Sequence, residues 1–154
     1  MTGVVFRSSM RRASTAPRPW LSTHTIEFRA RYPECDPMGV VHHSVYPIYF
    51  EMGRTEMLRA AGGDYRAMEA AGVFLAVVTL EVRYLRPARY DELLRLETGL
   101  TAPGPVKIEH EYRLHRGEEL LVEGRTVLAC LDRSGRPQAV PGTNLAPVAT
   151  ESRA

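Results

Sequence analysis

The strongest constraint on the fold is a single long helix-forming segment with no comparable helix after it. We predict this helix over residues 44–61, with Ser44 as the N-cap, Pro47 in the first turn and Gly62-Gly63 as the stop signal. At ~1.5 Å per residue it would be roughly 27 Å long. Its apolar side chains form two stripes, and one polar band lies between them. The first stripe is Val45, Ile48, Tyr49 and Met52, and the second is Phe50, Met57, Leu58 and Ala61. The polar band consists of Glu51, Arg54, Thr55 and Arg59. A helix that is apolar over most of its circumference is typical of a buried core position.

Strand-like segments make up most of the remaining sequence. Residues 106–115 give the clearest pattern, because core-type and charged side chains alternate without interruption, which a helix would not do. Further strands are expected at 23–31, 74–85, 92–101 and 119–132, and a short helix over 64–71. This order of one strand, a long helix and four antiparallel strands predicts an α+β domain in which a strongly curved sheet wraps the helix.

Composition limits the class of protein. With 154 residues the chain is long enough for one domain with a sizeable core. Its net charge of +2, with basic residues spread along the chain, argues against nucleic-acid binding. No apolar run approaches the roughly 18 residues of a membrane span. The two distant cysteines, Cys35 and Cys130, are typical of a reduced, cytoplasmic protein.

The two ends of the chain differ from the central domain, which we expect over residues 23–132. Residues 1–22 are basic and contain no acid, which indicates a disordered extension, with an over-long start before Met10 as one source of it; an organellar transit peptide is the alternative. Residues 133–154 have no period and are expected to form a loosely docked tail. The strand at 74–85 is apolar on both faces and needs an outer cover, which predicts at least a dimer.

The residues that could carry chemistry precede the long helix. Asp36 lies between Pro33 and Pro37, which break regular structure, so we expect its carboxylate on a loop. Gly39 supplies a turn. The pair His42-His43 follows at the amino end of the helix, where unpaired backbone N–H groups and the helix dipole concentrate positive potential. The sequence therefore places a carboxylate beside a helix N-terminus.

A longer pattern surrounds these residues and continues into the helix. It consists of Tyr32, Glu34, Asp36, Met38, Gly39, Val40, Val41, His43, Tyr46, Phe50-Glu51 and Gly53-Arg54-Thr55-Glu56, followed later by Tyr84, Pro87 and Tyr90-Asp91. This pattern resembles the signature of the 4-hydroxybenzoyl-CoA thioesterase family, and of its YbgC-type acyl-CoA thioesterase branch in particular. Four positions depart from that branch: Pro33, Cys35, Pro37 and His42. The resemblance covers about residues 23–132 and implies the hot-dog fold and hydrolysis of acyl-CoA thioesters.

The resemblance also implies roles for individual residues. Asp36 would act as general base or as nucleophile, and the backbone N–H of His43 would polarise the thioester carbonyl. The side chains of His43 and Tyr32 would position the acid or the substrate. Further substrate contacts would come from Gly39, Val40, Val41, His42, Tyr46 and Glu51, and contacts with the CoA phosphates from Arg86, Arg89 and Lys107. Coenzyme A is part of the substrate, so no separate cofactor or metal is expected. The site would lie between the subunits of a homodimer or homotetramer.

Three other functions stay open. A thioesterase could act on an acyl carrier protein, although related enzymes of that kind tend to lack the acid that Asp36 supplies. A hot-dog hydratase would need an Asp/His dyad on and after the helix, which this sequence does not show. A non-catalytic acyl-CoA-binding module would bind its ligand with Asp36 dispensable. Within the motif, Glu51 also fits an ion pair with Arg54, and neither a nucleophilic Cys35 nor a metal site has a supporting pattern.

Overall fold

The computed structural model describes residues 19–141, so the predictions for residues 1–18 and 142–154 lie outside the described part. The elements follow in the order β1 (Ser22–Arg29), η1 (Tyr32–Glu34), α1 (Tyr46–Ala60), α2 (Tyr65–Ala70), β2 (Phe74–Tyr84), β3 (Leu93–Pro103), β4 (Lys107–Arg116) and β5 (Glu119–Leu131). Each predicted helix and strand is therefore present, with ends shifted by a few residues.

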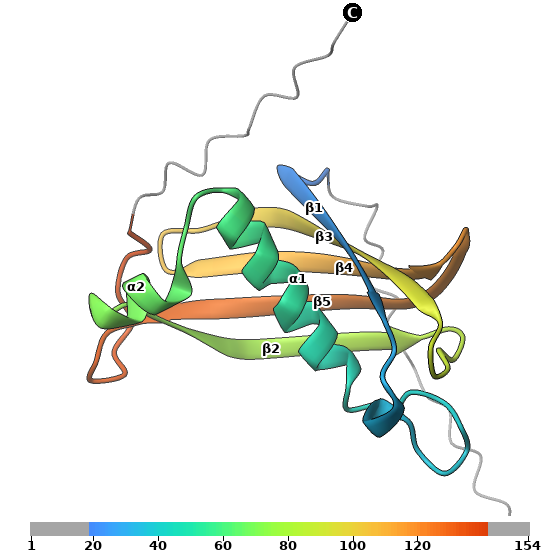
Figure 1. The fold of residues 1–154 in the computed structure, drawn as a ribbon. Helices are drawn as coiled ribbons and strands as arrows, with labels where there is room; N and C mark the ends of the chain where they lie inside the picture. Colours follow the sequence, from blue (N-terminus) through green and yellow to red (C-terminus); the bar gives the residue numbers. More distant parts are fainter. Residues whose placement is uncertain (1–18, 142–154) are drawn as a thin grey trace, which may run out of the picture.

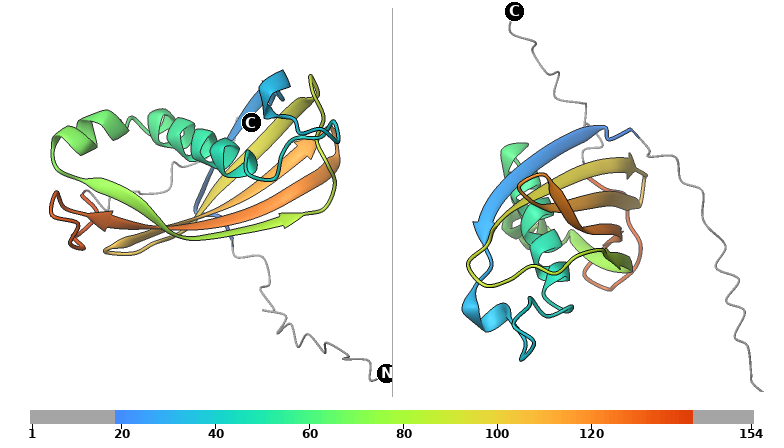
Figure 2. Two further views of the ribbon diagram at one scale, coloured as in Figure 1. Left: turned by 90° about the horizontal axis from the view of Figure 1, so that it is seen from below. Right: turned by 90° about the vertical axis from the view of Figure 1, so that its right-hand side faces the viewer.

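The five strands form one antiparallel sheet in the order β1-β3-β4-β5-β2. The sheet is strongly curved, and α1 lies across its concave face (Figures 1 and 2). Helix α1 packs chiefly against β1 and β3. The predicted α+β hot-dog arrangement is confirmed, although the sheet does not close around the helix.

The inner face of the sheet supplies most of the core. Along β4, Ile108, His110, Tyr112 and Leu114 are buried, while the residues between them are more exposed, as the alternating pattern predicted. From α1, Phe50 stacks on Tyr112 with ring centroids 4.4 Å apart. The backbone of Gly124 on β5 leaves room for this ring, because a Cβ there would lie 2.3 Å from Phe50.

Helix α1 begins later than predicted. Its first residue is Tyr46, and Val45 occupies the N-cap position without a side-chain hydrogen bond to the helix. The prediction of Ser44 as the N-cap is wrong, because its hydroxyl is hydrogen-bonded to Nδ1 of His42 at 2.8 Å. Pro47 lies in the first turn as predicted.

The polar band predicted on α1 is only partly correct. Glu51 and Arg59 are exposed, but Arg54 is only 8% exposed. Arg54 follows Phe50 by four residues, so both side chains project from the same face of the helix. The predicted ion pair is present, with Nη2 of Arg54 3.2 Å from Oε2 of Glu51.

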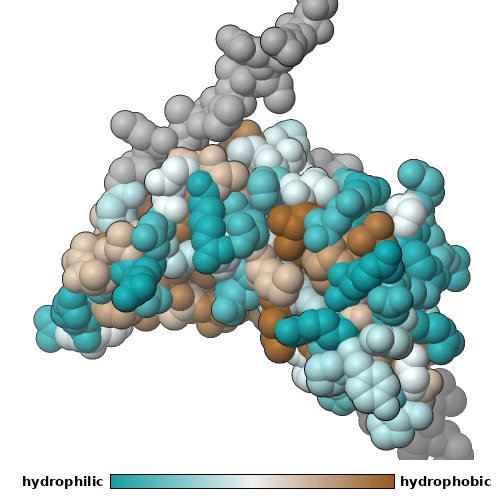
Figure 3. All heavy atoms as spheres, in the orientation of Figure 1, coloured by the Kyte–Doolittle hydropathy of each residue, from teal (hydrophilic) through white to brown (hydrophobic). Residues whose placement is uncertain are grey.

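One side of the concave face stays uncovered. The inward and outward side chains of β2 include the exposed apolar residues Val77, Val78 and Leu80. Ile48 of α1 is exposed as well. In the space-filling view of this face, hydrophobic atoms interrupt the charged surface (Figure 3). Apolar surface therefore remains beside an edge strand of the sheet.

The first residues after β5 pack against the core. Val140 is buried and its N–H donates to Pro105 O at 2.8 Å. The side chain of Gln138 donates to the carbonyl oxygens of Gly72 and Leu131. Within residues 19–141, no helix has the length and apolar character needed to cross a membrane.

Candidate functional site

The loop between η1 and α1 is folded into a tight, hydrogen-bonded turn. Cys35 and Val41 form an isolated antiparallel bridge at its base. Inside it, Asp36 N–H donates to Val40 O and Gly39 N–H donates to Asp36 O, both at 2.9 Å. Gly39 has a φ of +74°, so the predicted glycine turn is present. Residues with a Cβ rarely adopt this backbone conformation, which favours glycine here. Val41 N–H donates to Ala88 O at 2.8 Å and ties the loop to the segment after β2.

This loop orients the Asp36 carboxylate. Oδ1 accepts the backbone N–H of Met38 at 2.8 Å, which fixes the side chain against its own turn. Oδ2 has no hydrogen-bond partner among the described residues. The side chain is partly exposed. One oxygen therefore holds the carboxylate in place, while the other is available to a substrate or a water molecule.

The turn that leads into α1 offers a backbone donor close to this loop. Within the described part of the chain, the backbone N–H of His43 donates to no other atom. The carbonyl oxygen of the same residue accepts the Tyr84 hydroxyl at 2.8 Å. Burial raises the pKa of Tyr84 above its ordinary value, so the hydroxyl keeps its proton and remains a donor.

A cavity of about 310 Å³ brings these groups together. Its lining comes from the loop, the start of α1 and the end of β2: Asp36, Met38, Val40, Val41, His43, Tyr46, Tyr84, Leu85, Arg86 and Pro87. Six of these residues are among the predicted site residues. The wall is mostly apolar and aromatic, with one carboxylate, one histidine and one arginine. Such a lining suits an apolar group attached to a polar, reactive centre.

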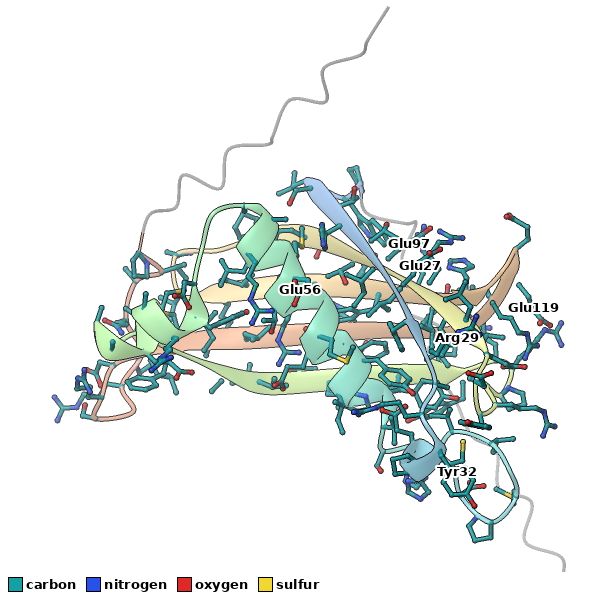
Figure 4. The ribbon with its side chains drawn as sticks, in the orientation of Figure 1. Glu27, Arg29, Tyr32, Glu56, Glu97 and Glu119 are labelled. Atoms are coloured by element: carbon teal, nitrogen blue, oxygen red, sulfur yellow. The ribbon has the colours of Figure 1, made fainter. Side chains whose placement is uncertain are left out.

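Several predicted residues lie outside this cavity. Tyr32 is 78% exposed on η1, where its ring meets Tyr90 edge-on, and Figure 4 places it beside the loop and beyond the end of β1. Gly39 forms the turn without lining the cavity. The ring of His42 contacts the ring of His43 at a tilt of 40°, with centroids 4.1 Å apart. Glu51 points to solvent and pairs with Arg54.

The three predicted phosphate-binding cations are distributed unequally. Arg86 lines the cavity, and its Nε lies 2.9 Å from Oε1 of Glu119, which Figure 4 shows at the β4–β5 turn. Nη1 of Arg89 donates to Gly39 O at 3.5 Å, at the rim of the loop. Lys107 begins β4 and pairs with Ala129, at the opposite end of the sheet. Only the two arginines therefore lie near the cavity in this chain.

The sequence motif did not assign four of the lining residues. These are Met38, Tyr84, Leu85 and Pro87. Three of them belong to the segment that ends β2, and Tyr84 and Pro87 already appeared in the longer sequence pattern. That pattern gave no role for Tyr84, because its contact with His43 joins residues 41 positions apart.

A larger hollow of about 850 Å³ lies on the sheet face that points away from α1. Its walls carry acids and bases that pair with each other, such as Arg83 with Glu123 at 3.3 Å and Arg125 with Glu81 at 3.7 Å. Such mutually paired charges are typical of a solvated sheet surface. Among residues 19–141, no group of three His, Cys, Asp or Glu side chains is placed to hold a metal ion.

The chain was compared with known proteins. A family model described as the thioesterase-like superfamily matches residues 30–150. The acyl-CoA thioester hydrolase YbgC of Escherichia coli O6:H1 is 33% identical over 115 residues, which cover 73% of this chain and 86% of that protein. The resemblance predicted from the motif is thereby confirmed.

Two solved structures support the same assignment. The hypothetical protein TT1821 from Thermus thermophilus is 38% identical, with a TM-score of 0.73 over 76% of this chain and 90% of that one. The DHNA-CoA thioesterase from Staphylococcus aureus is 28% identical, with a TM-score of 0.75 over 77% of this chain and 80% of that one. Sequence pattern, fold and relatives agree, and the chain belongs to the thioesterase-like superfamily.

Proposed function

We propose that this chain hydrolyses acyl-CoA thioesters to a free acid and CoA, with Asp36 as the catalytic carboxylate. The observation that carries the proposal is that Asp36 and the start of α1 line one cavity. The similarity to an acyl-CoA thioester hydrolase supports the substrate class. Oδ2 of Asp36 would either take a proton from an attacking water or attack the thioester carbon itself.

Both routes place negative charge on the carbonyl oxygen of the thioester. We propose that this oxygen accepts a hydrogen bond from the backbone N–H of His43, which has no acceptor among residues 19–141. Helix α1 begins three residues further on, at Tyr46, and the positive end of its dipole there would also favour the developing charge. Removing one donor of this kind typically lowers kcat by about 10²–10³-fold. Tyr84 would hold the His43 segment in place through its carbonyl oxygen.

The CoA part of the substrate would lie at the rim of the cavity. Arg86 and Arg89 are the two predicted cations near it. We propose that Arg86 exchanges its ion pair with Glu119 for a phosphate group, because a guanidinium binds phosphate with paired hydrogen bonds. The acyl group would then lie against the apolar wall of Val40, Val41 and the tyrosines.

We also propose that the working form is a homodimer or homotetramer with its sites at subunit interfaces. Within residues 19–141, β2 pairs only with β5, so no described strand pairs with its other edge. Exposed Val77, Val78 and Leu80 lie on it, and the same strand carries Tyr84 into the cavity. A second copy on this edge would cover the apolar side chains and wall the cavity. Sedimentation velocity tests this, since a monomer at micromolar concentration would contradict it.

A cytoplasmic location completes the proposal. Cys35 and Cys130 are both free thiols, which fits a reducing compartment.

The decisive experiment compares wild type with Asp36→Asn on a panel of acyl-CoA thioesters. The panel runs from short to long aliphatic chains and includes hydroxybenzoyl and phenylacetyl groups, with released thiol as the readout. Asn keeps the acceptor oxygen for Met38 N–H, so the turn should survive. We expect a loss of about 10²-fold or more in kcat, the scale for a lost general base.

Asp132→Asn is the matched control. The Oδ1 of Asp132 accepts the N–H of Ser134, two residues on, in the same way as Asp36, but this residue lies outside the cavity. Its activity should equal that of wild type. Full activity of Asp36→Asn would refute the role of this carboxylate. Binding of acyl-CoA without hydrolysis would favour the binding module, and hydrolysis of carrier-protein thioesters alone would change the substrate class.

A further inference from the structure

A buried carboxylate lies immediately before the loop between η1 and α1 that carries Asp36. Glu34 is only 7% exposed. Its Oε2 accepts the hydroxyl of Tyr49 at 2.6 Å and the backbone N–H of Arg31 at 2.7 Å. Its Oε1 accepts Nε and Nη2 of Arg31 at 2.7 and 2.6 Å. Four donors therefore converge on one carboxylate that is almost fully removed from solvent.

These contacts join three elements that hold the loop. Arg31 lies two residues after β1, Tyr49 is a buried residue of α1, and Glu34 is the last residue of η1. The backbone oxygen of Glu34 also accepts the N–H of His42 at 2.9 Å. One residue thus fixes the beginning of the loop through its side chain and the end of the loop through its backbone.

The carboxylate is strongly held in its ionised form. Burial acts to raise the pKa of Glu34, but the hydrogen bonds from Tyr49 and Arg31 outweigh it, so this pKa lies below its ordinary value. Loss of either partner would remove part of the hydrogen bonding of a buried charged group, which is costly. The loop position between Cys35 and Val41 therefore depends on this set of contacts.

We propose that Glu34 and Tyr49 form a clamp that positions Asp36 and the His43 N–H relative to each other. Neither residue lines the cavity, so both are positioning residues that act through the loop. The inference rests on the proposed function, because it assumes that these two groups carry the reaction. A displacement of about 1 Å at a reacting group can lower a rate by about 10²-fold.

Two substitutions and one matched control test the clamp. Tyr49→Phe and Glu34→Gln should each lower kcat by about 10–100-fold, with KM changed by less than about threefold because the cavity walls remain. Tyr112→Phe is the control. Tyr112 is equally buried, and its hydroxyl is hydrogen-bonded to Oγ1 of Thr126 at 2.7 Å, on strand β5 and not on the loop. It should lower the melting temperature by a similar amount and leave kcat within about twofold of wild type.

Amide hydrogen exchange separates failure of the clamp from failure of the proposed function. The backbone N–H groups of Asp36, Gly39 and Val41 are all hydrogen-bonded in the native loop. They should exchange at least about tenfold faster in Tyr49→Phe and Glu34→Gln than in Tyr112→Phe. Unchanged exchange would refute the clamp even in an active enzyme. Faster exchange with unchanged kcat would refute its catalytic role, whereas full activity of Asp36→Asn would refute the proposed function alone.

Discussion

A methyl group added at Gly124 tests how closely α1 lies on the sheet. A Cβ at this position would be 2.3 Å from Cε2 and 2.4 Å from Cζ of Phe50, where carbon atoms normally stay about 3.5–4.0 Å apart. The Phe50 ring is fully buried and stacks on Tyr112 with an interplanar angle of 13°, so it has no free space to enter. The ring and the helix must therefore move by about 1 Å or more.

The expected cost follows from two opposing effects. Replacing glycine by alanine in a compatible backbone stabilises a protein by about 0.4–1 kcal/mol, because the unfolded chain loses freedom. Overpacking a tight core costs about 1–3 kcal/mol. The second effect is larger, so Gly124→Ala should lower the free energy of unfolding by roughly 1–2 kcal/mol. In a chain of this size that corresponds to a fall of about 2–8 °C in Tm.

Urea denaturation followed by circular dichroism gives the measurement, and a double-mutant cycle identifies the cause. Phe50→Leu removes the ring atoms that the new methyl group would touch. The double variant should be more stable than the sum of the two single changes predicts, by at least about 1 kcal/mol. A stabilising Gly124→Ala, or strictly additive effects, would refute the close packing of α1 on β5.

Three further predictions concern single contacts. Tyr84→Phe removes the hydroxyl bond to His43 and should lower kcat in the thiol-release assay by about tenfold; an unchanged kcat would contradict its supporting role. Burial, reinforced by the nearby charge of Arg54, lowers the pKa of His110 to about 4. As the pH falls, the unfolded chain therefore protonates this histidine at a higher pH than the native protein does. The free energy of unfolding should fall by about 3 kcal/mol between pH ~6.5 and ~4. In His110→Leu the urea midpoint should change less between pH ~6.5 and ~4. If its pH dependence equals that of wild type, His110 is not the cause of the loss of stability. Asp64 caps α2 by accepting a backbone N–H at 2.8 Å, so Asp64→Ala should cost about 1 kcal/mol, and no change in the urea midpoint would show that α2 adds little stability.

The fold could be predicted because its signals are local. The alternation along residues 107–116 and the stop signal after α1 both lie within one stretch of sequence. The start of α1 could not, because Ser44 was free to cap the helix in the sequence but is held by His42 in the structure. The burial of Arg54 was recognisable in principle from its spacing to Phe50.

The candidate site shows the same division. The loop chemistry around Asp36 and Gly39 follows from neighbouring prolines and glycines, and the structure places that loop at the start of α1. Glu51 follows Tyr46 by five residues, which is about 140° around a helix, so it could not line the same cavity. The role of Glu34 needed the structure, since its partner Tyr49 is distant in sequence and its burial is a tertiary property.

The unpartnered N–H at residue 43 has a consequence for how this site can vary in evolution. The group belongs to the backbone, so nineteen of the twenty amino acids supply it equally and only proline removes it. Alanine scanning would therefore not detect the donor. Its contribution would emerge only from proline or from an amide-to-ester replacement at this bond. The side chain at this position could then change with the substrate, while the backbone donor that we propose for the thioester carbonyl oxygen would be inherited with the fold.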